Sequence, residues 1–220
     1  MSESFVHRTG FWAAVVLTIL GAVYLALLVG FFAIEGFRFP PTPFVQLVGG
    51  IVTILTAPTI LIIFAAILHL APPAKRILGT LGVCFSALFV MAVSINRFTQ
   101  LTVVRLAPAG PASADLARFL PYASDSVLFA MEILGWGLFL SLAMLSVAPL
   151  FRCSRLQSAV RWLQVTFAVF SLISVVGFAT ATPLTAAGFI AWGPVLFALA
   201  VVLAIFFQRG ETLLSAEAVL

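Results

Sequence analysis

Long apolar runs, separated by short polar connections, make up most of the chain. A helix of roughly 20 apolar residues crosses the hydrocarbon layer of a bilayer, which is about 30 Å thick. Six runs come close to this length, and they predict transmembrane helices at residues 11–34, 44–70, 77–95, 126–150, 162–179 and 186–208. The fold class that we expect is therefore all-α: a polytopic membrane protein, folded as a six-transmembrane-helix bundle, with residues 1–220 in a single membrane domain.

Hydropathy alone does not identify the first span or divide the last two. The first run is longer than the roughly 7–15 apolar residues of a signal sequence, so we expect 11–34 to be a retained first helix. The uncharged stretch 162–208 is too long for one span, and Pro183 lies in its middle. Because proline breaks a helix, that stretch predicts two helices joined by a short turn.

The connection between the third and fourth spans, residues 96–125, is much longer than the others. Its first part contains no helix breaker before Pro108, so the third helix is expected to extend as far as residue 106. Within 113–120, apolar and charged residues fall on different helix faces: Leu116, Phe119 and Leu120 against Asp115 and Arg118. This pattern predicts a short interfacial helix in the outer loop, lying along the membrane surface.

The positions of the basic residues predict the orientation of the bundle. With six spans, seven Lys and Arg lie on the side of both termini, and four lie on the other side, three of them on the long loop. Short cytoplasmic loops carry an excess of Lys and Arg. We therefore expect both termini to be cytoplasmic. The abundance of alanine and the preference for arginine over lysine favour a bacterial inner membrane.

Composition agrees with lipid as the solvent and narrows the partners. The chain is 63% hydrophobic and 8% charged, whereas a soluble domain carries roughly 25% charged residues. The net charge of +4 comes from basic residues that stand singly or in pairs between apolar runs. That distribution is typical of membrane orientation rather than of a phosphate-binding surface, so no nucleic acid is expected.

Few residues suit metal, redox or enzymatic chemistry. The only cysteines are Cys84 and Cys153, the only histidines are His7 and His69, and none has metal-ligand spacing. We therefore expect no metal and no cofactor. The chain contains no HExxH pattern, no nucleophile elbow and no phosphate-binding loop, so the sequence favours a protein that is not an enzyme.

Glu132 is the one charged residue inside a predicted span. A charged group at the bilayer centre costs at least about 2.5–3.5 kcal/mol, so such a residue marks a candidate functional site. Asn96, Arg97 and Gln100 lie at the outer end of the third helix and share a broad face, because they are three and four residues apart. Asp125 directly precedes the fourth helix. These five residues form the predicted polar cluster.

Two interpretations of this cluster remain open on sequence grounds. In one, Arg97 and Glu132 form an ion pair, and the amides hydrogen-bond across helices to fix the packing. In the other, the cluster lines a polar pocket that opens to the outside and binds a small ligand or relays a proton. Trp136 and Trp192 lie deeper in their spans and suit either the wall of such a pocket or ordinary core packing.

Three functional hypotheses follow. The leading one is binding or transport of a small or lipophilic ligand through the pocket near Glu132. The alternative is a non-catalytic membrane subunit that assembles with a membrane partner or as a homo-oligomer, through small residues that repeat at helical spacing: Ala22, Ala26 and Gly30. The third is an intramembrane enzyme with Glu132 as its acid. The expected partners are the lipid bilayer and either a small-molecule or lipid ligand or a second membrane protein.

Overall fold

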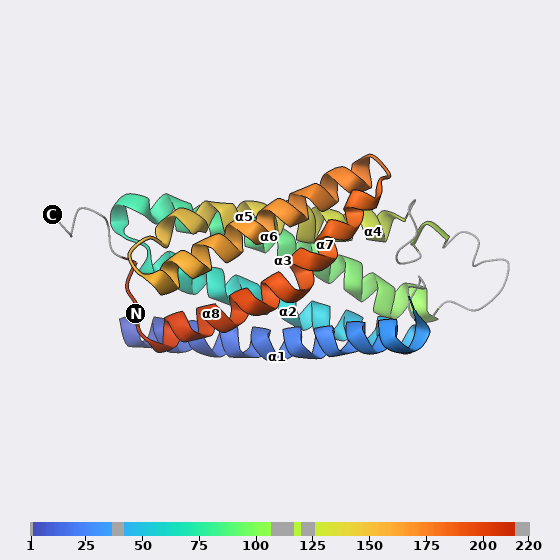
Figure 1. Cartoon of the computed structure of the whole chain (residues 1–220), viewed down its shortest axis with the longest axis horizontal. Coiled ribbons are helices and arrows are strands. Elements are labelled where there is room, and N and C mark those ends of the chain that lie inside the picture. Colours follow the sequence, from blue (N-terminus) through green and yellow to red (C-terminus); the bar gives the residue numbers. More distant parts are fainter. Residues whose placement is uncertain (1, 37–41, 107–116, 120–125, 214–220) are drawn as a thin grey trace.

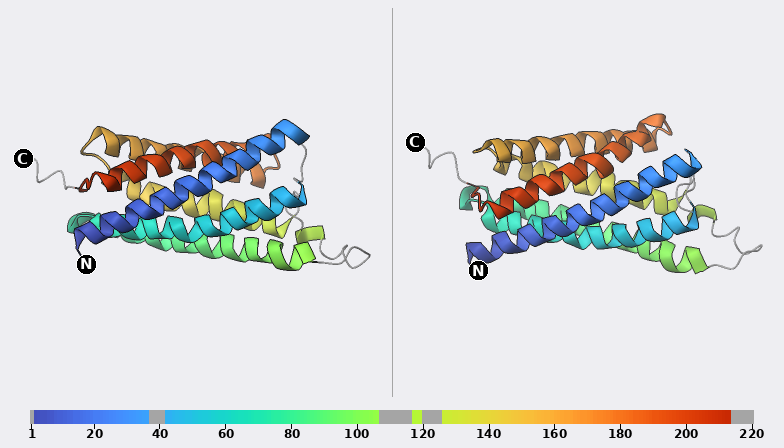
Figure 2. Two further views of the ribbon diagram at one scale, coloured as in Figure 1. Left: turned by 90° about the horizontal axis from the view of Figure 1, so that it is seen from below. Right: turned by 60° about the horizontal axis from the view of Figure 1, so that its bottom comes forward.

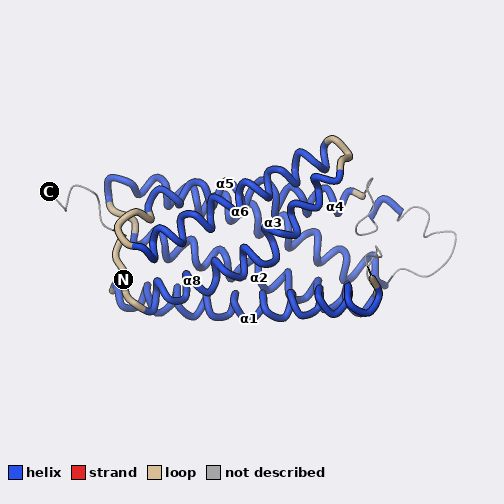
Figure 3. The backbone as a smooth tube through the Cα atoms, in the orientation of Figure 1, coloured by secondary structure: helices blue, strands red, loops and turns tan. Residues whose placement is uncertain are grey.

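The computed structural model describes residues 2–36, 42–106, 117–119 and 126–213. Within these ranges every regular element is helical and no strand occurs (Figure 3). Six helices among the described residues have the length and apolar character needed to cross a membrane. They extend over Glu3–Ile34, Pro43–Leu70, Pro73–Val104, Val127–Leu150, Arg155–Ala179 and Pro183–Gln208.

Several of these spans are composed of more than one element. The first, second and fifth are single α-helices, α1 (Glu3–Glu35), α2 (Pro43–Leu70) and α6 (Arg155–Ala179). The third is α3 (Arg76–Thr99), the fourth contains α4 (Val127–Glu132) and α5 (Leu140–Val147), and the sixth contains α7 (Ala187–Ile190) and α8 (Leu196–Gln208). Three π-helical segments interrupt or extend the third, fourth and sixth spans: Gln100–Val104, Ile133–Phe139 and Ala191–Val195.

The six spans form a closed ring in chain order, which we call the helix ring. Helix α1 packs against α2, α2 against α3, α3 against α5, α5 against α6, α6 against α8, and α8 returns to α1. The start of α1 and the end of α8 lie together at one end of the bundle, which we call the terminal end (Figure 1). Figure 2 shows α1 crossing obliquely over its neighbours α2 and α8. The opposite end, where α4 begins, is the Glu132 end.

Two helices begin well before the apolar runs that predict them. Helix α1 starts at Glu3 rather than near residue 11, and α6 starts at Arg155 rather than near 162. At α6 the cause is local, because the Ser154 hydroxyl accepts a hydrogen bond from the Gln157 backbone N–H at 3.1 Å and caps the helix. Backbone hydrogen bonds carry a helix into the polar headgroup region, whereas hydropathy records only the part suited to hydrocarbon.

Gln157 also holds the chain that follows α8. Its side-chain oxygen accepts hydrogen bonds from the backbone N–H groups of Arg152 and Cys153, at 3.1 and 3.0 Å. Its amide nitrogen donates to Glu211 and to the carbonyl of Thr212, at 3.2 and 3.1 Å. One buried side chain thus ties the turn before α6 to the residues after α8 at the terminal end.

Only part of the predicted outer-loop helix falls within the described residues. Ala117–Phe119 forms a short 3-10 turn, in which Arg118 and Phe119 are exposed. The other members of the predicted faces, Asp115, Leu116 and Leu120, lie outside the described residues. The third helix continues beyond α3 through the π segment and remains helical to residue 106.

Aromatic and aliphatic side chains fill the centre of the helix ring. Four of the fully buried phenylalanines come from four different spans: Phe64, Phe89, Phe167 and Phe206. A close approach between α3 and its neighbours depends on Gly82, where an added Cβ would lie 2.5 Å from Val147 Cγ1 and 3.0 Å from Phe64 Cδ1. Small residues thus let these helices approach closely, as they do in membrane bundles generally.

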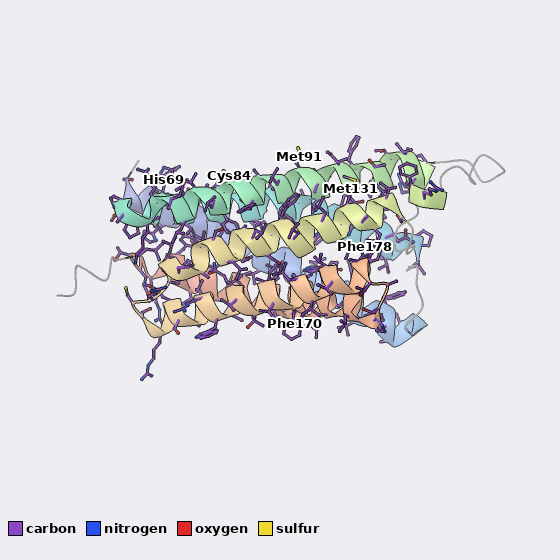
Figure 4. All side chains as sticks on the ribbon, turned by 90° about the horizontal axis from the view of Figure 1, so that it is seen from above. His69, Cys84, Met91, Met131, Phe170 and Phe178 are labelled. Carbon is purple, nitrogen blue, oxygen red and sulfur yellow. The ribbon has the colours of Figure 1, made fainter. Side chains whose placement is uncertain are left out.

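The outside of the helix ring is apolar as well. Large apolar side chains are exposed on several helices, including Ile19, Leu88, Met91, Val169 and Val176. Cys84 and Met91 project from the side of α3 that faces away from the other helices (Figure 4). Soluble proteins rarely expose continuous apolar surface of this kind. The surface and the six apolar helices together indicate a membrane protein.

Candidate functional site

The structure brings the polar side chains of α3 against α4. Asn96 and Arg97 lie in the last turn of α3, and Gln100 begins the π segment that follows. Helix α4 begins after Ser126, whose hydroxyl accepts a hydrogen bond from the Phe129 N–H at 3.2 Å. Glu132 is the last residue of α4, about 9 Å from that cap at the helical rise. The capped start of α4 therefore sets the depth of the carboxylate.

Four side chains form a closed cycle of hydrogen bonds, which we call the polar cluster. The Glu132 carboxylate accepts from Arg97 Nη2 at one oxygen and from Asn96 Nδ2 at the other. Arg97 Nη1 donates to Gln100 Oε1 at 2.9 Å. Gln100 Nε2 donates to Asn96 Oδ1 at 2.8 Å and closes the cycle. Both carboxylate oxygens thus have a donor, and the single negative charge faces a single positive charge.

This cluster is removed from solvent. Asn96 is fully buried, Arg97 and Glu132 are each 7% exposed, and Gln100 is half-buried. Buried charges persist only when they are paired and hydrogen-bonded, because desolvation otherwise outweighs their attraction. The two amides matter for that reason. Asn96 supplies the second donor to the carboxylate, and Gln100 gives the guanidinium a further acceptor.

A cavity between the helices adjoins the polar cluster. Arg97 and Glu132 form part of its wall, together with residues of α1, α2, α8 and the two π segments nearest to it. The cavity has a volume of about 40 Å³, which is room for about three water molecules at roughly 10–15 Å³ each. We call this space the Glu132 cavity.

The remaining wall of the Glu132 cavity is mostly apolar and aromatic, with a few hydroxyl groups. Thr53 and Thr56 on α2 donate their hydroxyl hydrogens to the carbonyls of Gly49 and Val52, at 2.7 and 2.9 Å. Each hydroxyl has a single hydrogen, so these two oxygens serve the cavity as acceptors only. The apolar walls are chiefly leucines, namely Leu17, Leu20 and Leu196.

Four aromatic residues line the cavity, Tyr24, Phe197 and two tryptophans. The rings of Trp136 and Trp192 have centroids 6.4 Å apart at an interplanar angle of 47°. Trp192 Nε1 donates to the Ser171 hydroxyl at 3.0 Å. Trp136 packs edge to face on Phe89, with ring centroids 4.8 Å apart, and its Nε1 has no hydrogen-bond acceptor among the described residues. Both rings are therefore held in place by neighbours outside the cavity.

All three π-helical segments of the described chain lie at this site. Gln100 of the polar cluster begins the first segment. Trp136 lies in the second, which starts directly after Glu132, and Trp192 lies in the third. A π segment widens the backbone hydrogen-bond pattern, is rare, and occurs frequently at functional sites. Two of the segments line the Glu132 cavity and the third contributes Gln100 to the polar cluster, an arrangement that helix packing alone does not require.

Sequence reasoning anticipated part of this arrangement. The structure places Asn96, Arg97 and Gln100 around Glu132, whereas Asp125 lies outside the described residues. The same residues form an ion-pair network and border a cavity, and both interpretations of the cluster stay predictions. Residues that the sequence did not single out as lining include Leu17, Leu20, Gly21 and Tyr24 of α1. No pattern in an evenly apolar helix marks the face that they occupy.

No protein-family model matches the chain, and it matches neither a curated protein nor a solved structure.

Proposed function

We propose that the protein binds a small, electrically neutral, amphipathic molecule in the Glu132 cavity. Its role is either to bind this molecule or to transport it across the membrane. The observation that carries the proposal is the composition of the cavity wall. An ion-pair network forms one side, and apolar and aromatic residues form the rest. Ligand sites commonly have this composition: mostly apolar surface with a few placed polar groups.

Charge balance supports a neutral ligand. The Glu132 carboxylate and the Arg97 guanidinium neutralise one another, so the wall presents no net charge. An anion or a cation would enter an apolar space without a counter-charge, at a large desolvation cost. A neutral ligand with a hydroxyl group avoids this cost, because it can donate its hydroxyl hydrogen to the acceptor oxygen of Thr53 or Thr56.

The setting of this site in a membrane is part of the proposal. We propose that the six helices insert in the bacterial inner membrane with both termini cytoplasmic, so that the Glu132 end is the outer end. The excess of Lys and Arg on the terminal side supports this orientation. The segment 113–120 would then lie at the outer membrane surface as an interfacial helix.

Tryptophan fluorescence offers a direct test, with trichloroethanol as a small, neutral, hydroxyl-bearing quencher. The variant Trp12→Phe/Trp162→Phe retains only the cavity residues Trp136 and Trp192. In proteoliposomes, trichloroethanol should quench this variant with a saturable component. Trichloroacetate, a quencher of similar size that carries a negative charge, should quench it weakly, because the neutral wall offers no counter-charge.

The complementary variant, Trp136→Phe/Trp192→Phe, is the matched control. It retains Trp12 and Trp162, whose side chains are exposed on the outside of the helix ring. Their quenching should rise in proportion to trichloroethanol in the bilayer and should not saturate. Saturation in both variants, or in neither, would contradict a specific site. Equal quenching by trichloroacetate would contradict a neutral ligand.

A second candidate function is assembly with another membrane subunit. Ala22 and Ala26 are exposed on α1, and nothing lies within 4 Å of a Cβ added at Gly30, so the small-residue face points away from the helix ring. Such faces allow close contact between membrane helices. Disulfide cross-linking of Ala26→Cys between copies would support self-association, with the buried position Ala13→Cys as control. Absence of cross-linking at Ala26→Cys would exclude a homo-oligomer through this face.

A further inference from the structure

A second cavity lies beyond the Glu132 cavity, toward the terminal end. Residues of α1, α2, α5, α6 and α8 line it, and all of them are apolar except Gln164. Its volume is about 10 Å³, which is room for about one water molecule. We call it the Gln164 cavity.

The two cavities share part of their lining. Both are lined by Leu17 of α1 and Leu196 of α8, which therefore stand between them. On α2 the lining residues continue from one cavity to the other at spacings of three or four, along a single helix face: Val52, Thr56, Ile60, Ile63 and Ile67. At the helical rise this face extends about 22 Å, most of the roughly 30 Å of a hydrocarbon layer.

Gln164 is an unusual residue for the place that it occupies. It is 1% exposed, in the middle of α6, and its Oε1 accepts no hydrogen bond from any described residue. A buried acceptor without a donor costs free energy, and a leucine of similar size would avoid that cost. The amide is explained if a hydrogen-bonding molecule visits the cavity.

We propose that the Glu132 cavity and the Gln164 cavity form a path through the helix ring for small neutral hydroxyl compounds. In this path Leu17 and Leu196 form the apolar constriction, and Gln164 provides the polar contact beyond it. The inference rests on the proposed function and extends it from binding to passage. A molecule leaving the oxygens of Thr53 and Thr56 would meet the next free acceptor at Gln164 Oε1. Apolar constrictions gate such paths by excluding water and polar solutes until they widen.

Cysteine accessibility tests this path without knowledge of the physiological ligand. In a background of Cys84→Ala and Cys153→Ser, the variant Gln164→Cys is reconstituted in liposomes and treated with methyl methanethiosulfonate, a small neutral thiol reagent. Adding Leu17→Ala should raise the labelling rate about tenfold, because it removes one side of the constriction. Leu196→Ala removes the other side and serves the same purpose if Leu17→Ala fails to fold.

Two further variants separate a path from a general loosening of the bundle. Ala168→Cys lies one turn from Gln164 on α6, is fully buried and lines neither cavity, so its labelling should not respond to Leu17→Ala. Thr53→Phe places a bulky ring in the Glu132 cavity and should abolish the faster labelling at Gln164→Cys.

Each outcome decides the inference. If neither constriction variant accelerates labelling at Gln164→Cys, or if Ala168→Cys accelerates equally, the two cavities are not a path. Unchanged labelling with Thr53→Phe would also overturn it, because the reagent would then reach Gln164→Cys by another route. Failure of the proposed function gives a different result. Trichloroethanol would then quench the Trp12→Phe/Trp162→Phe variant without saturation, while Leu17→Ala would still accelerate labelling at Gln164→Cys.

Discussion

Replacing Glu132 by glutamine removes the negative charge of the polar cluster while nearly preserving the shape of the side chain. In the wild-type protein each carboxylate oxygen accepts a hydrogen bond, one from Arg97 and one from Asn96. A glutamine retains one acceptor oxygen and puts an NH₂ group in place of the other. One donor therefore faces a donor, and the buried Arg97 guanidinium loses its counter-charge.

The expected cost follows from the burial of the pair. Hydrogen bonds to charged groups contribute about 1.5–3 kcal/mol each, and breaking a buried ion pair from one side costs about 3–5 kcal/mol. We expect Glu132→Gln to lower the free energy of unfolding by about 3 kcal/mol, since one acceptor remains. Arg97→Met should cost at least as much, because the buried carboxylate loses its positive partner.

The double variant distinguishes an ion pair from two independent contacts. Removing both charges leaves no unbalanced charge, and buried pairs replaced in this way often lose little stability. Arg97→Met/Glu132→Gln should therefore lie about 2 kcal/mol below the wild-type protein, rather than the roughly 6 kcal/mol expected from adding the single effects. Reversible unfolding in mixed micelles with increasing sodium dodecyl sulfate gives the four free energies.

A matched control is Glu3→Gln, which neutralises an exposed carboxylate in the first turn of α1. It should change the free energy of unfolding by less than about 1 kcal/mol. A stabilising role for the buried pair is refuted if Glu132→Gln costs no more than Glu3→Gln. Coupling between the two charges is refuted if the double variant shows the sum of the two single losses.

Further predictions concern packing, the terminal end and topology. Gly177→Ala should cost about 1–3 kcal/mol, because its Cβ would lie 2.1 Å from the Thr185 backbone nitrogen, whereas Gly30→Ala, with nothing within 4 Å, should cost nothing measurable in the same unfolding assay. Gln157→Leu should release the chain after α8, seen as faster hydrogen exchange there but unchanged exchange in α3. A cysteine introduced at Ala109 should react with impermeant reagents from the outer side only, and cytoplasmic labelling would disprove the proposed orientation.

The sequence by itself predicted six apolar helices, and it predicted Asn96 and Arg97 as neighbours of Glu132. Hydropathy suffices for the helices, because every backbone polar group in hydrocarbon must be bonded within its own helix. The cluster was predictable because helices that follow one another in the chain pack together, and a buried carboxylate between them requires nearby donors. Asn96 and Arg97 lie at the matching end of the third span, so few other arrangements were available.

Only the tertiary structure decided where the cavities lie and which helices line them. The packing of α8 against α1 joins the two ends of the chain, and it places Leu17 and Leu196 in the lining of both cavities. Neither leucine differs in sequence from the many others around it, since an apolar side chain suits lipid, core and cavity wall equally well. The π segments that contain Trp136 and Trp192 are likewise seen only in the folded chain. Sequence identifies a polar residue in a membrane helix because it is costly there, whereas an apolar residue acquires its role only from its neighbours.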